Sequence, residues 1–402
     1  MARTAALLPA ADSTVVPERT LGVGSSSLRD SASAGAEAAR SASGALVTPA
    51  LVIVFASDAH DLPTLIGAIS DVVGDAPLIG CSTAGEISGR GAKDSTVVVV
   101  ALGGSGFSIA TTSATGIAGR LHEAGAEVAS CLASVAARPH RVLMLLSDGL
   151  SGDQQQLVRG AYSVAGAEVP LVGGCAGDDL KMRRTHQFHG RQVLEDSVVA
   201  AAIASNAPLG IGARHGWIPV GDPVLVTSSA GNRVFTLADR PALDVYLERL
   251  GVEEPARSSP AEFTRFAITH PLGIRRRTGE EVRFVGEANF VDRSLGCIAN
   301  VPQGGLAWFM TGDDDSVLLA TDAACADALR SLGDLPPLGF IAFDCIGRRG
   351  VLGDQGVRKE IDRISSRSGG APVAGFYTYG EIARTAGISG FHNQTLVILA
   401  IA

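Results

Sequence analysis

A short glycine-containing motif recurs in this 402-residue chain, and each copy ends in an acidic residue. Residues 76–87 (APLIGCSTAGEI) return as residues 371–382 (APVAGFYTYGEI), with seven of twelve positions identical. Residues 170–179 (PLVGGCAGDD) form a variant that is one residue shorter. A buried strand that ends in glycines exposes backbone N–H groups, and the following carboxylate sets a negative charge beside these donors. This pairing predicts a binding site for a small zwitterion.

The acids of the three copies, Glu86, Asp178 and Glu381, are the groups that could hold a ligand ammonium. The same segments would present polar and bare backbone groups to the ligand through Thr83, Gly85 and Gly174. A carboxylate in this position can instead stabilise the start of a helix, by about 0.3–1 kcal/mol. Recurrence in both halves also suits a duplicated structural turn, so both interpretations are open.

Three of the six cysteines, Cys81, Cys175 and Cys345, follow predicted strands beside glycines. Backbone donors there could lower the pKa of a thiol and make it reactive. A catalytic cysteine also needs a base, which only the fold could supply by bringing His392 near. The alternative is that these thiols are buried and inert.

Arg348 follows the predicted strand Phe340–Phe343 and is expected at the same edge of the sheet. Its planar guanidinium can pair with a carboxylate through two parallel hydrogen bonds. The carboxylate could belong to the ligand, or to one of the motif acids in a salt bridge.

His392 and Asn393 lie just before the last predicted strand. Their imidazole and amide groups could contact the polar edge of a ligand, and His392 could also ligate a haem iron. Alternatively, they satisfy backbone groups of the loop. Tyr377 and Tyr379 alternate along an extended segment, so their side chains would share a side and could form the wall of a pocket.

The composition excludes several classes of function. A chain of 402 residues with 46% hydrophobic residues fits two domains or two related subdomains. The net charge of -8, with no basic run longer than Arg275–Arg277, argues against binding to nucleic acid or to an anionic membrane.

The cysteine spacing and the N-terminus predict a cytoplasmic protein. The six cysteines contain no Cys-x-x-Cys pair, so they suit neither a zinc site nor a disulfide framework, and we expect free thiols in a reducing compartment. The first nine residues are too weakly charged and too short in apolar length for a secretory signal. No apolar run approaches membrane-spanning length.

The N-terminal half alternates short aliphatic runs with helical patterns after a flexible tail predicted over residues 1–19. Such alternation predicts a mixed or parallel sheet with helices on its faces, and a ligand at the carboxyl ends of the strands. The predicted strands cover residues 20–24, 51–56, 78–80, 97–102, 107–111, 142–146 and 170–173, and the predicted helices cover residues 27–43, 62–73, 121–136 and 153–164.

The C-terminal half is richer in short strands, including a hairpin across residues 230–232. Residues 253–261 are predicted to be a surface loop, residues 266–269 a strand and residues 313–315 a solvated turn. Helices are predicted over residues 241–250, 323–332 and 358–365.

The predicted fold class is therefore α/β, with two domains of mixed sheets flanked by helices. Residues 20–216 form an N-terminal unit of alternating strands and helices, and residues 217–402 form a C-terminal α+β unit.

Five motifs in this order resemble the FIST family, in which a FIST N domain precedes a FIST C domain. They are LIGCSTAGEIS (78–88), LVGGCAGDDL (171–180), FDCIGR (343–348), AGFYTYGEIA (374–383) and FHNQTL (391–396). The resemblance runs from about residue 20 to residue 401. It implies a sensory input module of bacterial signal transduction that binds small ligands such as amino acids. Some members are fused to kinase, cyclase or chemoreceptor outputs, and certain members are described as haem-binding nitric-oxide sensors.

We therefore hypothesise a cytoplasmic sensory protein that binds an amino acid or a similar small polar metabolite between its two units. A separate partner, such as a histidine kinase or a cyclase, would read the resulting change, since nothing outside the two units is expected to hold an output domain. No catalytic residue, metal, nucleic acid or membrane is expected. The alternatives are a haem-binding nitric-oxide sensor, a cysteine-dependent enzyme and a scaffold without a ligand.

Overall fold

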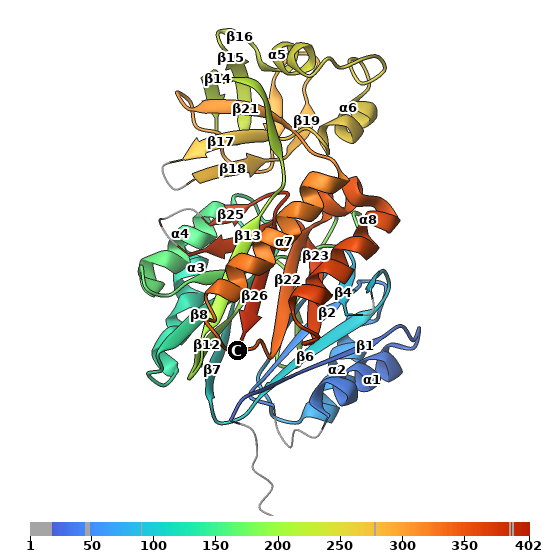
Figure 1. Cartoon of the computed structure of the whole chain (residues 1–402), viewed down its shortest axis with the longest axis vertical. Coiled ribbons are helices and arrows are strands. Elements are labelled where there is room, and N and C mark those ends of the chain that lie inside the picture. Colours follow the sequence, from blue (N-terminus) through green and yellow to red (C-terminus); the bar gives the residue numbers. More distant parts are fainter. Residues whose placement is uncertain (1–17, 45–48, 90, 277–278, 386, 388–389) are drawn as a thin grey trace, which may run out of the picture.

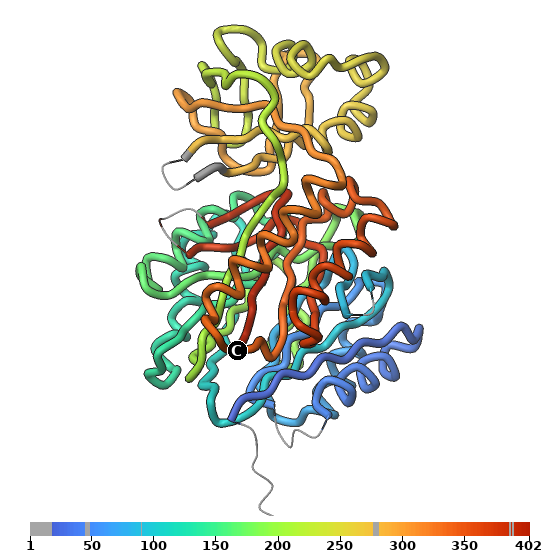
Figure 2. Tube along the Cα trace, viewed as in Figure 1, coloured from blue at the N-terminus to red at the C-terminus, as the bar shows by residue number. Residues whose placement is uncertain are grey.

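The computed structural model describes residues 18–44, 49–89, 91–276, 279–385, 387 and 390–402. These residues form two bodies, which we call the core and the lobe, and the lobe consists of residues 218–311 (Figure 1). The chain leaves the core after strand β13 (Leu209–Arg214) and returns at helix α7 (Asp314–Arg330), as Figure 2 shows along the trace. The boundary predicted near residue 216 lies at the exit from the core. Apart from Glu18 and Arg19, the predicted tail lies outside the described residues.

The core contains three repeats of one pattern, in which two strand-helix units lead to a third strand, a hairpin and a last strand. The first repeat comprises β1 (Thr20–Ser26), α1 (Ser31–Ser43), β2 (Leu51–Ala56), α2 (Leu62–Val73), β3 (Leu78–Ser82), β4 (Glu86–Ser88), β5 (Gly91–Lys93) and β6 (Val97–Gly103). The second comprises β7 (Phe107–Thr115), α3 (Leu121–Ala129), a 3-10 turn (Ser130–Ser134), β8 (His140–Ser147), α4 (Gln154–Ala165), β9 (Leu171–Cys175), β10 (Gln187–His189), β11 (Gln192–Leu194) and β12 (Ser197–Ser205). The third comprises β13, α7, β22 (Gly339–Cys345), α8 (Ile346–Arg367, kinked at Gly353), β23 (Val373–Thr378), β24 (Glu381–Arg384), β25 (Phe391–His392) and β26 (Leu396–Ile401), with the lobe inserted after β13.

Each repeat passes its hairpin to the sheet of another repeat. The described strands of the core form three six-stranded sheets with equivalent orders, β1-β6-β2-β3-β10-β11, β7-β12-β8-β9-β24-β25 and β13-β26-β22-β23-β4-β5. The hairpin β4-β5 pairs with β23, β10-β11 pairs with β3, and β24-β25 pairs with β9. In each sheet the third and fourth strands are parallel. The exchange joins the three repeats into a closed cycle.

The strands of the core are apolar on both faces because both faces are covered. All six residues of β2 (LVIVFA) are buried, as expected for strands packed between layers. The inner faces of the three sheets pack together, and the ring of Phe55 lies 4.7 Å from that of Phe376 in another sheet. The outer faces are covered by the pairs α1-α2, α3-α4 and α7-α8 (Figure 1).

The lobe has a separate hydrophobic core under an eight-stranded sheet. Its elements are β14 (Ile218–Ala230), β15 (Arg233–Leu237), β16 (Arg240–Pro241), α5 (Ala242–Arg249), α6 (Pro260–Ala267), β17 (Leu272–Arg276), β18 (Gly279–Arg283), β19 (Val285–Ala288), β20 (Leu295–Cys297) and β21 (Leu306–Thr311). The predicted hairpin across residues 230–232 is confirmed by the pairing of Ala230 with Arg233.

The predicted fold class is confirmed, and local signals placed most of the elements. Asp61 and Asp153 cap α2 and α4 as predicted. Two predictions failed because a cap was overlooked. Asp313 caps α7, so residues 313–315 are not a solvated turn, and Ser259 with Pro260 begins α6 where a loop and a strand were predicted.

The described helices give no candidate for a membrane span. Within the part of the chain that the structure covers, none combines the length and the apolar character needed to cross a bilayer.

Candidate functional site

Three turns meet at one end of the core, where the parallel strands finish. The first turn (residues 83–85) joins β3 to β4, the second turn (residues 176–186) joins β9 to β10, and the third turn (residues 379–380) joins β23 to β24. Ala84 donates its N–H to the carbonyl of Tyr377 (3.0 Å), and Cys175 donates to Gly380 (2.7 Å). Gly177 donates to Ser82 (3.0 Å). The three motif copies, far apart in sequence, therefore lie together.

The glycines of these turns permit close contact between segments. A Cβ atom on Gly177 would lie 2.8 Å from the backbone nitrogen of Ala84, and one on Gly174 would lie 2.7 Å from Cγ2 of Thr378. Gly85 has a φ of +119°, and a Cβ atom there would meet Nη1 of Arg349 at 2.4 Å. At these three positions the turns pack directly against neighbouring segments, which requires glycine.

The strand pairing of the exchanged hairpins shows which residue of the second repeat occupies the position of Glu86 and Glu381. Glu86 pairs with Phe376, Glu381 with Gly174 and Gln187 with Cys81, at equivalent positions of the three sheets. Gln187, not Asp178, is therefore the counterpart of the two glutamates. Aligning the three motif copies did not identify Gln187, because the second turn has more residues between its glycines and the strand β10 than the other two turns have.

Glu86 and Glu381 are buried and hydrogen-bonded within their own repeats. Glu86 accepts hydrogen bonds from the Thr83 hydroxyl and from the N–H (3.0 Å) and hydroxyl (2.6 Å) of Thr96. Glu381 accepts equivalent bonds from the Thr378 hydroxyl and the Thr395 N–H (3.1 Å). Burial raises the pKa of Glu86 to about 7 and that of Glu381 to about 8. This geometry supports a role in stabilising the turns and argues against the ammonium-binding role expected from the sequence.

Asp178 has a structural role in the second turn. Its carboxylate accepts hydrogen bonds from the Tyr379 hydroxyl and from the N–H groups of Met182 (2.9 Å), Arg183 (2.7 Å) and Arg184 (3.0 Å). Burial opposes ionisation, but these hydrogen bonds outweigh it and lower the pKa of Asp178. Asp178 and Tyr379 therefore hold the second turn against the third.

Arg348 is fully buried and pairs with acids that lie outside the motif. It donates to Asp344 (2.8 Å) and Glu360 (2.5 Å), and also to the carbonyl of His215 (2.8 Å). Burial, followed by the neighbouring Glu360, raises the pKa of Asp344 well above its usual range. The expectation that Arg348 holds a ligand carboxylate is not supported, because its guanidinium is already engaged.

Tyr377 lies beneath α8 on the outer face of its sheet, with the guanidinium of Arg349 5.1 Å above its ring. Its hydroxyl is buried and has no hydrogen-bond partner among the described residues. Tyr379 uses its hydroxyl on Asp178 and on the Leu180 N–H (2.8 Å). The two tyrosines therefore contact different parts of the protein and do not form one wall.

Cys345 accepts a turn hydrogen bond that equivalent residues accept in the other two repeats. Its sulfur accepts hydrogen bonds from the N–H groups of Gly347 and Gln394. Ser57 and Asp148, which follow the equivalent strands β2 and β8, likewise accept from the N–H two residues ahead, at 3.1 and 2.9 Å. Cys345 therefore closes a turn that every repeat contains. Cys81 lies in the inner core and Cys175 in the layer beneath α3 and α4.

We predict that none of the six cysteines reacts rapidly in the native protein. All six are buried, and burial raises the pKa of each thiol. Alkylation with iodoacetamide at neutral pH, followed by mass spectrometry, should show slow labelling of all six and complete labelling after denaturation. One thiol that reacts much faster than the others would contradict this and revive the cysteine-enzyme hypothesis. Cys345→Ser should fold, and the loss of its labelled peptide identifies the signal that belongs to Cys345.

Two of the buried side-chain atoms that lack a partner among the described residues belong to the adjacent Asn393 and Gln394, in the segment that contacts the lobe. The Oδ1 atom of Asn393 and the Oε1 atom of Gln394 are buried without a donor in the described part of the chain. Gln394 has a φ of +52° and donates through Nε2 to the carbonyl of Ile268 in the lobe (2.7 Å). A strained backbone and unsatisfied polar atoms are features of functional sites. The sequence indicated the polar segment that contains both residues, but of the two only Asn393 was predicted to contact a ligand.

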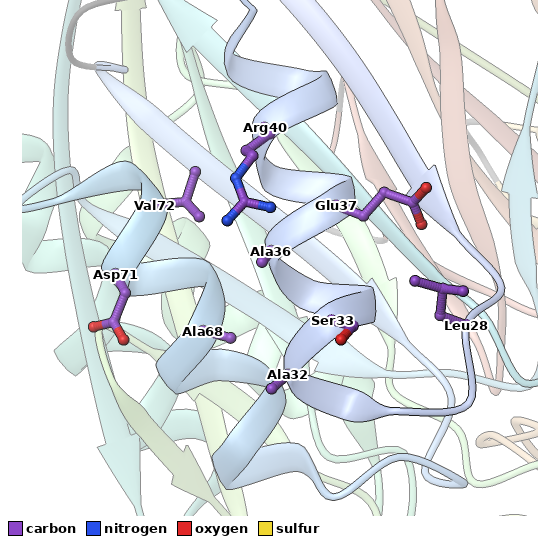
Figure 3. Close-up of a pocket in the computed structure, with 9 residues that line it drawn as sticks. All are labelled: Leu28, Ala32, Ser33, Ala36, Glu37, Arg40, Ala68, Asp71 and Val72. Carbon is purple, nitrogen blue, oxygen red and sulfur yellow. The ribbon is translucent and has the colours of Figure 1, made fainter.

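Haem does not fit the residues around His392. The Nε2 atom of this half-buried side chain lies 2.9 Å from the carbonyl oxygen of Ala383. Two surface hollows of about 580 and 590 Å³ lie elsewhere on the core, and neither lining contains histidine or cysteine. The first lies between α1 and α2 on the outside of the core, where alanines form its floor below Arg40 and Asp71 (Figure 3). The described residues also contain no cluster of histidine, cysteine or acids suited to a metal ion.

Comparison with known proteins identifies two matching domain families. The FIST N domain matches residues 50–240 and the FIST C domain matches residues 242–384. An uncharacterized protein of Mycobacterium tuberculosis is 27% identical over 403 residues, covering 93% of this chain and 97% of that protein. An uncharacterized protein of Mycobacterium bovis has the same identity and coverage. One of Methanocaldococcus jannaschii is 25% identical over 189 residues, covering 45% of this chain and 36% of that protein.

Proposed function

Because this chain belongs to the FIST family, whose domains are associated with sensors of signal transduction, we propose that it is a cytoplasmic small-ligand sensory protein. The ligand is an amino acid or a similar small polar metabolite with a protonated amine. It binds where the lobe meets the core. A separate output protein, such as a histidine kinase or a cyclase, reads the bound state.

The observation that carries this proposal is the pair of unpartnered carbonyl oxygens on Asn393 and Gln394. Both side chains are about 2% exposed or less, and a buried acceptor without a donor costs about 1–3 kcal/mol. A ligand ammonium supplies the missing N–H donors. The amine-binding role therefore moves from the motif acids to these two amides, next to the half-buried His392.

The position of Gln394 supports this assignment. A Cβ atom on Gly347 would lie 3.2 Å from Cγ and 3.3 Å from Nε2 of Gln394, so a larger residue at the start of α8 would displace this side chain by a few tenths of an ångström. Its Nε2 atom reaches the lobe through Ile268. A ligand bound to Oε1 of Gln394 therefore touches a residue that is already in contact with both bodies.

Thermal unfolding of the purified protein with a panel of the amino acids and simple amines tests the proposal. A ligand at 100 times its Kd should stabilise the native state by about 2.7 kcal/mol and raise Tm. Gln394→Met keeps the approximate volume of the side chain but removes both Oε1 and the Nε2 donor to Ile268, so it should abolish the shift, as should Asn393→Leu, which leaves Gln394 unchanged. Gln303→Met, at an exposed position of the lobe, should leave the shift unchanged. If no compound raises Tm, or if Gln394→Met responds like the native protein, the proposal fails.

A further inference from the structure

The two connections between core and lobe run side by side and depend on glycine. Gly216 has a φ of +84°, and a Cβ atom there would lie 2.8 Å from the carbonyl oxygen of Ser316 and 2.9 Å from Cα of Val317. A Cβ atom on Gly312 would lie 2.6 Å from the ring of Trp217. The outgoing residues 215–217 and the returning residues 312–317 therefore cross in direct contact. We call these two segments the hinge.

The core side of the hinge is fixed by Arg348. Its guanidinium donates to the carbonyls of His215 (2.8 Å) and Val317 (3.4 Å), one in each segment of the hinge, while Asp344 anchors it to β22. The counterparts of Asp344 in the other sheets are Ala56 and Ser147, which cannot supply the same ion pair. The buried ion pairs of Arg348 thus belong to the repeat that carries the lobe.

The lobe and the core pack around different hydrophobic cores, with one small apolar cluster between them. The lobe has its own hydrophobic core, whereas the apolar cluster between the two bodies consists of Trp217, Val282 and Met310 with Trp308 and Val351 packed against it. Two units that each have their own hydrophobic core can move relative to one another unless a large hydrophobic interface joins them. The indole of Trp217 also donates to the carbonyl of Gln394 (3.0 Å).

We propose that the lobe turns about this hinge relative to the core, and that Gln394 couples its position to the ligand. The coupling to ligand rests on the proposed function, whereas the motion of the lobe does not. Gln394 contacts the hinge through its backbone carbonyl and the lobe through Nε2. Closure of the lobe on the core keeps both contacts, and opening breaks the bond to Ile268 and exposes Trp217.

The two tryptophans of the chain, Trp217 and Trp308, make this motion measurable. In Trp308→Phe the remaining fluorescence comes from Trp217, which is 3% exposed in the closed arrangement. A Cβ atom on Gly350 would lie 3.5 Å from Cγ2 of Ile268, so the double variant Ile268→Cys/Gly350→Cys places two thiols close together across the lobe and the core, where oxidation is designed to join them. Because the six native cysteines are buried, oxidation is expected to join the two introduced cysteines in preference to the native ones.

Acrylamide quenching of Trp217 in this triple variant tests the motion. Oxidation should lower the quenching constant several-fold, and reduction should restore it to that of Trp308→Phe alone. Because the reduced sample is the same polypeptide, a folding defect of the variant would appear in both states. Equal quenching in the oxidised and reduced states, with the disulfide shown by mass spectrometry, overturns the proposal.

Repeating the quenching experiment with added amine tests the coupling to ligand separately from the motion of the lobe. Any amine that raises Tm should lower quenching in Trp308→Phe and have no further effect on the oxidised variant. A ligand that raises Tm without changing quenching overturns the coupling through Gln394. If no amine raises Tm, the proposed function and this coupling fail, while the comparison of oxidised and reduced protein still decides the motion.

Discussion

Arg348→Met is expected to destabilise the protein by about 3–5 kcal/mol, because it leaves two buried carboxyl groups without their cation. Arg348, Asp344 and Glu360 are each 1% exposed or less. Urea denaturation followed by circular dichroism measures the loss. The neighbouring Arg349 provides the matched control, since its pair with Asp94 is partly exposed and should contribute about 1 kcal/mol or less.

The same site offers a rescue experiment. Combining Arg348→Met with Asp344→Leu and Glu360→Met removes all three charges, and buried ion pairs can often be replaced by apolar residues of similar size. We expect most of the lost stability to return. If Arg348→Met alone is no less stable than Arg349→Met, then the buried charges are not interdependent and our account of this cluster is wrong.

Glu381→Gln and Glu86→Gln are expected to stabilise the protein in alkaline solution and to flatten the dependence of its unfolding free energy on pH. Both carboxyls bind a proton more tightly in the folded chain than in the unfolded chain, where the pKa is near 4.5. Their contribution is therefore complete below pH 4.5 and is lost as pH rises through about 7 for Glu86 and about 8 for Glu381. A neutral glutamine does not show this loss.

The second repeat shows how glutamine fits this position. Nε2 of Gln187 donates to Thr185 (3.2 Å), and Oε1 accepts from the Ser197 hydroxyl (2.6 Å). In Glu381→Gln the amide would donate to Thr378 and accept from the Thr395 N–H in the same way. The expected gain above pH 8 is on the order of 2–4 kcal/mol.

Urea denaturation at a series of pH values checks this prediction. Glu123→Gln, at an exposed position of α3, should leave the pH profile unchanged. Glu381→Ala should destabilise at every pH by about 1–3 kcal/mol, because it leaves the Thr395 N–H buried without an acceptor. A native profile that is flat between pH 4.5 and 8 would show that these carboxyls are not protonated in the folded protein.

Local structure and family membership could be predicted from the sequence because their signals lie close together along the chain. Capping residues such as Asp61 and Asp153, and aliphatic runs such as that of β2, act within a few residues. The repeated glycine motif also correctly indicated which strand ends carry the turns. Two of the missed segments, α6 and the first turns of α7, had such caps at Ser259 and Asp313 that could have identified them, whereas the first turns of α8 have no side-chain cap.

The candidate site depended on the tertiary structure. Whether Glu86 and Glu381 face a ligand or the protein is decided by Thr96 and Thr395, which lie beyond the hairpins, and by the exchange of those hairpins between sheets. Strand pairing across repeats of similar apolar pattern leaves no local mark, because the energies that select it come from packing between distant segments. The sequence alone thus determined the elements and their motifs, whereas only the assembled sheets decided that the acids are buried and that Gln394, with its unpartnered Oε1, contacts the lobe.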